Sequence, residues 1–368
     1  MRLPWAIRGI SFPAGRGLVY CAARVDPIKK GNSLPAYSVQ SFEFLRVGVF
    51  CGLVGAVYYF LFRWWIARLR GEEPRTAVAR VFCLRATGAV LTGLALLGVL
   101  CIPYGFFIEP YWLKVTRHEL RTPKLPEGTR VRIVHIADLH VRENGPRERK
   151  LPDLVRDLEP DLILHTGDFF GRGDGLDPVL VSLLRSWAVP QFACKGNLDR
   201  LGNFAGVMRD AGITVLNGSF ERLALGDARL TIAGYASGKE MAMPAGLAKL
   251  PADTFNIVLY HHPQGFPQTW VPQTWGTGAD LMLAGHTHGG QIRLPFYGAL
   301  VTLDRYGKCW ESGFFEEQGV SLIVSRGLGC EPFTPEMRFL CRPEVIVLEL
   351  IGTGESSNRP VNSGTRQP

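Results

Sequence analysis

Apolar residues are concentrated in two long runs near the start of the chain. Residues 47–62 are an unbroken run of apolar, Gly and Tyr residues, and residues 86–108 form a second run that two Thr and one Pro interrupt. Each run approaches the ~20 residues that cross a bilayer as a helix, and Tyr and Trp residues lie near the ends, as is typical of membrane interfaces. The alternative is a signal peptide followed by a core helix, but its apolar region would begin too late in the chain. We therefore predict a membrane anchor of two transmembrane helices over residues 44–111.

The pattern changes from residue 130 to residue 350, where short apolar runs alternate with turn residues. Five runs with few charges predict buried strands, at residues 131–137, 161–166, 190–195, 255–261 and 280–284. Helical spacing lies between some of them, at residues 147–158 and 177–187, which predicts an α/β sheet. Gly226-Asp227 separates two alternating runs within residues 219–235 and predicts a hairpin, and so an antiparallel component.

Three segments lack such patterns. Residues 1–43 are rich in Arg, Gly, Pro and Ser and are expected to be loosely ordered. Residues 112–129 contain Pro and Lys and are expected to form a linker between the anchor and the domain. Residues 351–368 are polar and are expected to form a disordered tail.

Charge is unevenly distributed along the chain. Residues 1–125 carry 17 Lys and Arg against 6 Asp and Glu, whereas the remaining residues are slightly acidic. The predicted domain therefore does not favour a nucleic-acid partner. Six Arg in the loop between the two apolar runs favour a cytoplasmic loop, with the domain on the other side of the membrane. Basic residues also flank both runs, so the side on which the domain lies stays open.

The eight cysteines form no CxxC pair, and we expect them to be free, buried thiols. They do not decide the redox compartment.

Metal-binding side chains follow each of the five predicted strands. Because sites in open α/β sheets form at the carboxyl ends of the strands, these side chains should converge. A mixed set of His, Asp and Asn exceeds what one tetrahedral ion needs and suits two ions that share a carboxylate. His135 and His165 lie within strands instead and are expected to be core residues. The candidate ligands are Asp138, His140, Asp168, Asn197, His261, His286 and His288.

The motifs DLH, GD, GN, HHP and GHTHGGQ resemble those of the calcineurin-like metallophosphoesterases, over roughly residues 130–350. GHTHGGQ, the later SRGLG and the spaced Arg338 and Arg342-Pro343-Glu344 are similar to a membrane-anchored bacterial branch. That branch includes exported phosphoesterases and a UDP-2,3-diacylglucosamine hydrolase of lipid A synthesis. The resemblance implies a four-layer sandwich of two mixed β-sheets flanked by helices, here preceded by the two transmembrane helices.

The resemblance also implies a role for each candidate. Asp138, His140 and His288 would hold one divalent ion, Asn197, His261 and His286 a second, and Asp168 would bridge them. His261 is preferred to His262 because the family's ligand stands two residues before the Pro. The ions would be Mn, Fe or Zn, and the hydroxide that they generate near neutral pH would attack phosphorus. Four residues are expected to support the site or contact substrate: Lys195, Asp199, His262 and Gln291.

The third motif departs from the family. It is usually GNHD or GNHE, but here it is Gly196-Asn197-Leu198-Asp199. Leu198 cannot transfer a proton, and general acid help is typically worth ~10²–10⁴-fold. This favours a phosphoanhydride, whose leaving group is a stable anion, over an alkyl phosphodiester. Alternatively, His262, Lys195 or a water supplies the proton.

The resulting hypothesis is a two-pass membrane phosphoesterase. It would act on a phosphorylated small molecule or lipid in the bilayer, for example UDP-2,3-diacylglucosamine. A non-catalytic metal-binding protein, suggested by Leu198, and a nuclease of the same superfamily are the alternatives. Intact metal ligands argue against the first, and the slightly acidic domain argues against the second.

Overall fold

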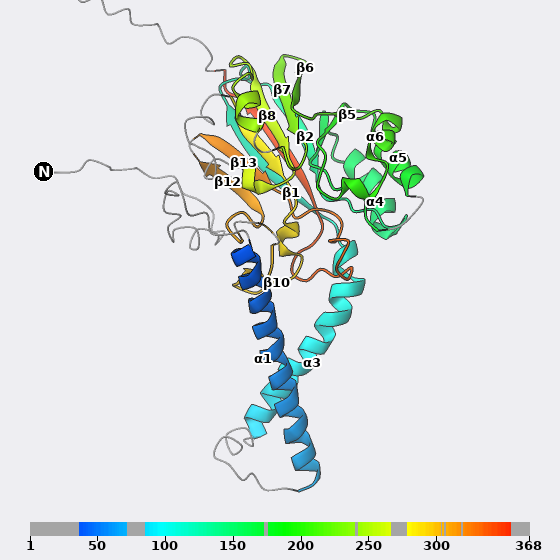
Figure 1. Cartoon of the computed structure of the whole chain (residues 1–368), viewed down its shortest axis with the longest axis vertical. Coiled ribbons are helices and arrows are strands. Elements are labelled where there is room, and N and C mark those ends of the chain that lie inside the picture. Colours follow the sequence, from blue (N-terminus) through cyan, green and yellow to red (C-terminus); the bar gives the residue numbers. More distant parts are fainter. Residues whose placement is uncertain are drawn as a thin grey trace, which may run out of the picture.

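The computed structural model describes residues 37–71, 85–172, 176–239, 242–265, 278–302, 304, 307–317 and 319–354. Its described part is a globular domain on a stalk of two long helices (Figure 1). The predictions for residues 1–36 and 355–368, and for Cys21 and Cys83, lie outside the described residues. The other six cysteines are free, as expected, but only three of them are buried: Cys51 is exposed, and Cys101 and Cys309 are half-buried.

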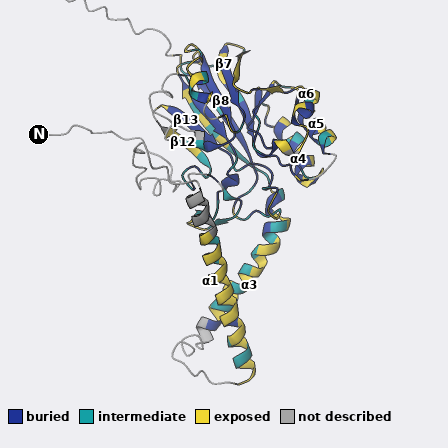
Figure 2. Cartoon of the chain, viewed as in Figure 1, coloured by how far each residue is buried: buried dark blue, intermediate teal, exposed yellow. Residues whose placement is uncertain are grey.

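The stalk consists of α1 (Tyr37–Leu69) and α3 (Arg85–Phe107). The stretches Leu45–Leu69 and Gly88–Tyr111 are long and apolar enough to cross a membrane, and few of their residues are buried (Figure 2). Helix α1 begins at Tyr37, so the end of the segment predicted to be loosely ordered is helical.

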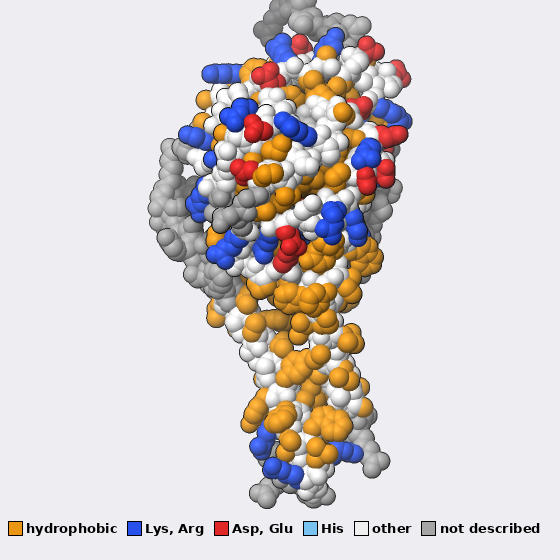
Figure 3. Space-filling view, turned by 90° about the vertical axis from the view of Figure 1, so that its right-hand side faces the viewer, with side chains coloured by type: hydrophobic (Ala, Val, Ile, Leu, Met, Phe, Trp, Pro, Cys, Tyr) orange, Lys and Arg blue, Asp and Glu red, His pale blue; other side chains and the backbone are white. Residues whose placement is uncertain are grey.

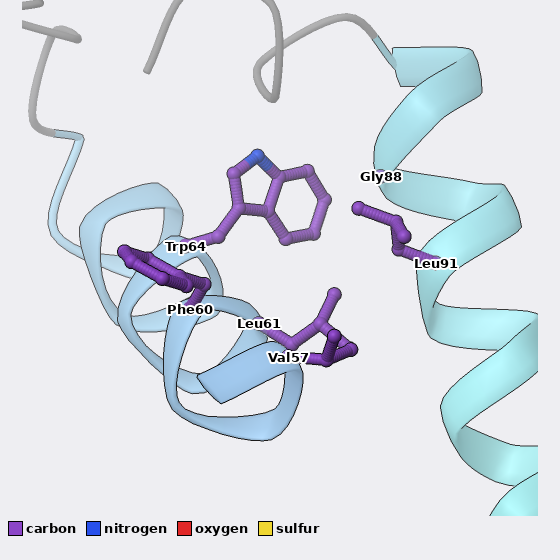
Figure 4. A pocket seen from close by; sticks show the side chains of 6 residues that line it. All are labelled: Val57, Phe60, Leu61, Trp64, Gly88 and Leu91. Carbon is purple, nitrogen blue, oxygen red and sulfur yellow. The ribbon is translucent and has the colours of Figure 1, made fainter. Parts of the chain in front are cut away.

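The two stalk helices contact each other through a small residue. A Cβ at Gly88 would collide with the indole of Trp64, which points at α3 from α1 (Figure 4). Nearby, Tyr58 Oη donates to the Ala95 carbonyl over 2.8 Å, and Trp65 Nε1 lies 3.3 Å from Thr92 Oγ1. Small residues and interhelical hydrogen bonds are what hold helices together in lipid.

Two six-stranded mixed sheets form the domain. In the first sheet, β14 and β2 are antiparallel and all other neighbours are parallel; in the second, the edge strands β12 and β6 are antiparallel to a parallel centre. The first sheet is ordered β1 (Lys114–Thr122), β14 (Glu344–Gly352), β2 (Arg130–Ile136), β3 (Leu162–His165), β4 (Gln191–Ala193) and β5 (Thr214–Val215). The second is ordered β12 (Gly313–Glu317), β13 (Val320–Val324), β9 (Leu281–Ala284), β8 (Phe255–Tyr260), β7 (Ala228–Tyr235) and β6 (Ser219–Leu225).

The sheets face each other across a shared apolar core, in which Ile133 and Leu164 of the first sheet lie with Ile257 and Leu283 of the second. Three helices cover the outer face of the first sheet: α4 (Pro146–Arg156), α5 (Asp177–Arg185) and α6 (Phe204–Ala211). The short α7 (Met243–Leu247) covers the outer face of the second. This confirms the predicted four-layer arrangement. The five predicted strands, the predicted hairpin and the helices predicted at residues 147–158 and 177–187 are present within a few residues of their expected bounds.

The predicted linker is wrong for part of its length. Residues 114–122 form β1, the edge strand that pairs with β14 along its whole length. An edge strand has one side in solvent and commonly carries charged side chains, so the sequence KVTRHELRT gave no apolar run that would have marked a strand.

Candidate metal centre

The candidate ligands lie in loops at the carboxyl ends of the parallel strands of both sheets. Asp138 and His140 follow β2, Asp168 follows β3 and Asn197 follows β4. His261 follows β8, and the 286–288 loop follows β9. Backbone hydrogen bonds join neighbouring loops: the N–H of His140 donates to the Asp168 carbonyl over 3.0 Å, and the N–H of Gly285 donates to the His261 carbonyl over 3.0 Å. The two sheets therefore bring together residues that are up to 150 positions apart.

The candidate ligands form three groups of three residues. Within each group, the ligand atoms lie within 4.8 Å of one another. The groups are Asp138 with His140 and His288, Asp138 with Asp168 and His261, and His261 with His262 and His286. Asp168 Oδ2 lies 3.2 Å from His261 Nε2 and 3.6 Å from His140 Nε2. The carboxylate predicted to bridge the two ions thus contacts a histidine from each predicted ligand set.

Hydrogen bonds fix the orientation of two of these imidazoles. His140 Nδ1 lies 3.0 Å from the Phe170 carbonyl, and His261 Nδ1 lies 2.8 Å from the Thr166 carbonyl. A carbonyl can only accept, so Nδ1 carries the proton and a neutral ring presents a bare Nε2. The Nε2 atoms of His140, His261 and His288 are buried and have no hydrogen-bond partner in the described part of the chain. Buried imidazole nitrogens beside carboxylates are the donor set of a divalent transition-metal or zinc ion.

The protonation states reflect the concentration of negative charge. Burial raises the pKa of Asp138 to about 7. Burial by itself would lower the pKa of His261, but the neighbouring carboxylates of Asp168 and Asp138 raise it to about 9. Burial opposes ionisation of Asp168, yet His261 and His140 hold the pKa of that carboxyl well below its usual range. In the absence of a bound cation, a His261 pKa of about 9 means that its Nε2 also carries a proton, facing the Asp168 carboxylate 3.2 Å away, and a metal ion that bound to Nε2 would displace that proton.

Backbone strain is concentrated at the same residues. Asp138, His140, Asp168, His286 and His288 all have positive φ angles, between 39° and 71°. Such conformations cost about 1–3 kcal/mol each for residues other than Gly and persist only where the surrounding structure holds them. The turns aim successive side chains inward immediately after a strand ends.

Asp199 holds together two of the loops that carry predicted ligands. Its buried carboxylate accepts hydrogen bonds from the backbone N–H groups of Asp168, Phe169 and Gly196, over 3.0, 2.7 and 2.7 Å. It thereby joins the loops that follow β3 and β4. Gly196 is needed at this contact, because a Cβ there would collide with the Asp168 carboxylate.

The other predicted residues are placed as follows. The Asn197 amide oxygen is buried, and Leu198, next in the chain, donates its backbone N–H to Asp168 Oδ1 over 2.8 Å. His262 Nε2 lies 2.7 Å from Ser237 Oγ. The Lys195 ammonium lies over the ring of Phe204, 5.6 Å from its centroid.

Gln291 holds a neighbouring loop. Its side-chain oxygen accepts from the Glu331 N–H over 2.9 Å, and its amide nitrogen donates to Thr334 Oγ1 over 3.1 Å. It thus fixes the 331–334 loop against the end of the last ligand motif.

Arg338 has a supporting role that the sequence did not reveal. The guanidinium is fully buried and donates to the carbonyls of Cys341, Arg326 and Gly327 over 3.0, 2.9 and 3.2 Å, and to that of Gly329. It also lies 3.5 Å from His288 Nδ1. The motif similarity marked this residue without giving it a function.

Glu109 is a second residue that sequence reasoning missed. It follows α3 in the short helix η1 (Glu109–Tyr111), and its buried carboxylate accepts from the backbone N–H groups of Leu340, over 2.9 Å, and Cys341. The signal was present in the sequence, because an acidic residue at the end of an apolar run requires a specific partner.

Comparison with known proteins agrees with this geometry. Residues 131–290 match the calcineurin-like phosphoesterase family. The chain is 29% identical to the uncharacterized metallophosphoesterase YkuE of Bacillus subtilis, over 68% of this chain and 90% of that protein. It is 31% identical to the phosphodiesterase YaeI of Escherichia coli, over 74% of this chain and all of that protein. A shorter match, 36% identical over 30% of this chain and 35% of the other, is to the UDP-2,3-diacylglucosamine pyrophosphatase LpxG of Chlamydia muridarum. The chain therefore belongs to the calcineurin-like phosphoesterase family and is a metal-dependent phosphoesterase.

Proposed function

We propose that this phosphoesterase is anchored in a membrane by α1 and α3 and hydrolyses the phosphoanhydride bond of a nucleotide-sugar lipid, with two divalent ions of Mn, Fe or Zn. The observation that carries the dinuclear assignment is that the buried Nε2 atoms of His140 and His261 both lie beside the Asp168 carboxylate, while His288 is grouped with Asp138 and His140. One ligand set would be Asp138, His140 and His288, the other Asn197, His261 and His286, with Asp168 shared.

When bound, such ions supply Lewis acidity and lower the pKa of water toward neutrality. The chain's own contribution is to hold the ligands in place. Carbonyls of Thr166 and Phe170 orient two rings, and Asp199 fixes the loop that carries Asp168. Rigid support of this kind is worth ~10–100-fold in metal affinity or activity.

Leu198 supports the choice of an anhydride. Its side chain is only 4% exposed and carries no group that could protonate a leaving alkoxide. A nucleoside monophosphate leaving group does not need that proton, because it departs as a stable anion.

The lipid part of the proposal has two supports. The stalk offers two exposed apolar stretches, Leu45–Leu69 and Gly88–Tyr111, long enough to cross a membrane twice. About a third of the length of LpxG matches this chain, and LpxG is named for a pyrophosphatase activity on a diacylated nucleotide sugar.

The test is hydrolysis by the detergent-solubilised full chain with added Mn²⁺, on UDP-2,3-diacylglucosamine, bis-p-nitrophenyl phosphate and p-nitrophenyl phosphate. We expect the anhydride to give the highest kcat/KM. Turnover of either nitrophenyl ester without turnover of the lipid would contradict the proposed substrate class while leaving the metal centre intact.

A substitution at Leu198 tests whether the missing proton donor determines the preference for an anhydride. Leu198→His should raise activity on an alkyl phosphodiester by ~10–10²-fold, less than a full general-acid effect because the surroundings were not built for an imidazole. Activity on the anhydride should change little, and bound metal should not change. Equal gains on both substrates would show that the native proton donor lies elsewhere, with His262 and Lys195 the next residues to test.

A further inference from the structure

We infer that the hairpin of β10 (Arg293–Leu294) and β11 (Gly298–Ala299) is embedded in the lipid surface and holds the metal centre at the depth of the phospholipid headgroups. We call residues 293–299 the foot. The inference rests on the proposed membrane anchoring and adds to it a second, independent membrane contact made by the domain itself.

The tip of the foot presents aromatic side chains to the outside. Residues 295–297 read Pro-Phe-Tyr and are all exposed, with Phe296 fully exposed and Tyr297 41% exposed. Phe296 also has a φ of 64°, a conformation that residues other than Gly rarely adopt. A fully exposed Phe side chain next to a partly exposed Tyr is suited to a membrane interface, where Tyr is enriched.

The foot lies beside the membrane-spanning part of α1. Leu294, Tyr297 and Leu300 form one wall of an apolar groove of about 350 Å³, and the other wall is α1 between Leu45 and Leu53. The candidate span of α1 begins at Leu45, and at 1.5 Å per residue the groove follows it for about 12 Å. If α1 crosses the membrane along this span, then the foot is at acyl-chain depth and lipid fills the groove.

The opposite side of the stalk continues the same apolar band. Phe107 and Ile108, at the end of α3, and Leu340, which Glu109 holds against it, are all exposed. Figure 3 shows hydrophobic side chains gathered at the base of the globular domain, directly above the helices. This continuity with both candidate spans favours lipid as the occupant rather than a protein.

Cations accompany the aromatic tip. Arg46 lines the same groove, and the Lys308 ammonium lies over the ring of Tyr297, 3.7 Å from its centroid. Basic residues beside interfacial aromatics pair with the phosphates of lipid headgroups.

The foot is firmly joined to the metal centre. It follows η6 (His288–Gly290), which carries a predicted ligand. Arg293 donates from Nη1 to the Gly289 carbonyl over 3.0 Å and forms an ion pair with Glu311 at 2.7 Å. The backbone N–H of Arg293 donates to the Phe339 carbonyl over 2.9 Å. Insertion of the foot would therefore fix the height of the ligands above the bilayer.

Photocrosslinking of the full chain in vesicles of phosphatidylcholine and phosphatidylglycerol tests this inference. p-Benzoylphenylalanine is placed at Phe296, at Leu53 in the middle of α1, and at Phe220, an exposed position on β6. We expect lipid adducts at positions 296 and 53 and none at position 220. A lipid adduct at position 53 without one at position 296 would contradict the insertion of the foot but not the anchoring by α1. A protein adduct at position 296 would have the same meaning. No lipid adduct at 53 overturns the proposed anchoring itself.

Activity provides a second readout. Phe296→Ser should lower kcat/KM on vesicle-embedded UDP-2,3-diacylglucosamine by about tenfold, and leave turnover of soluble bis-p-nitrophenyl phosphate unchanged, since Phe296 contacts no ligand residue. Phe220→Ser is the matched control and should change neither rate. Equal losses on both substrates, or no loss on the vesicle substrate, would count against the foot.

Discussion

At the scale of single residues, the centre depends on Asp168. Its Oδ2 lies 3.2 Å from His261 Nε2 and 3.6 Å from His140 Nε2, its Oδ1 accepts the Leu198 N–H, and its own N–H donates to Asp199. The negative charge of Asp168 is what raises the pKa of His261 against the effect of burial. The same charge would screen two neighbouring divalent ions from each other.

Asp168→Asn should therefore abolish activity and lower the amount of bound metal. We expect turnover to fall by more than about 100-fold, since even outer contacts of a metal site cost 10–100-fold, and bound metal to fall below two ions per chain by elemental analysis. Asp157→Asn, at an exposed position after α4, is the control and should retain both. Two ions bound to Asp168→Asn with normal turnover would rule out the dinuclear assignment.

The adjacent histidines His261 and His262 form a natural matched pair. His261 is oriented by the Thr166 carbonyl and presents Nε2 to Asp168, whereas His262 is hydrogen-bonded to Ser237. His261→Ala should lower kcat by more than about 100-fold and His262→Ala by less than about tenfold. Both rates and the metal content should be measured. The opposite order would show that His262 is the ligand, although the site would remain.

At the scale of elements, the end of α3 is built into the support of the metal centre. Glu109 holds the backbone of Leu340 and Cys341, the N–H of Arg338 donates to the Gly105 carbonyl over 2.9 Å, and the Arg338 guanidinium reaches His288. A continuous set of buried hydrogen bonds thus joins the stalk to a predicted ligand. Replacing the stalk by another anchor would therefore remove contacts that support the candidate metal centre.

Glu109→Gln tests this connection. An amide has one acceptor oxygen in place of two, so one of the two buried N–H groups loses its charged partner, at a cost of about 1–3 kcal/mol. We expect a lower Tm of the detergent-solubilised protein and weaker metal binding in titrations of the apoprotein. Glu119→Gln, on the exposed side of β1, should alter neither. Unchanged metal affinity in Glu109→Gln would mean that the stalk and the centre are independent.

The elements also show where sequence patterns succeed. Strands buried on both faces, such as β2 and β8, appear as apolar runs and were predicted close to their true bounds. The edge strand β1 was not, because its exposed positions carry charges. The strand β14 was also missed, although it is buried, and its place between β1 and β2 could not be read from a local pattern.

At the scale of the whole molecule, two core histidines make stability depend on pH. His135 and His165 are fully buried, as predicted, and burial lowers their pKa values to about 3 and about 4. In the unfolded chain both titrate near 6.5, so only the unfolded state takes up protons as the pH falls below that value. The stabilisation is complete above pH 6.5 and is lost as the pH falls toward 4, by about 1.4 kcal/mol per pH unit for each histidine.

His165→Gln should flatten this dependence, since the amide cannot titrate and can still reach Gln191, the present hydrogen-bond partner of His165. Thermal melting of wild type and variant between pH 7.5 and 4.5 measures how Tm changes with pH in each protein. Because the predicted metal ligands are the same in both, a difference between the two curves is due to His165. Parallel curves would show that His165 does not contribute to the acid lability.

The sequence by itself determined the local features of this protein. Two apolar runs long enough for a bilayer, alternating short strands and helices, and a polar ligand after each strand are all properties of neighbouring residues. They sufficed for the fold class and for seven candidate ligands. Only the tertiary structure decided which of those ligands meet, because their convergence depends on the order of strands in two sheets. It also decided that Asp199 braces two loops, that Glu109 and Arg338 join the stalk to His288, and that the foot lies beside α1. Those contacts join residues that are far apart in the chain, and burial and charge pairing at such distances leave no periodic signal in the sequence.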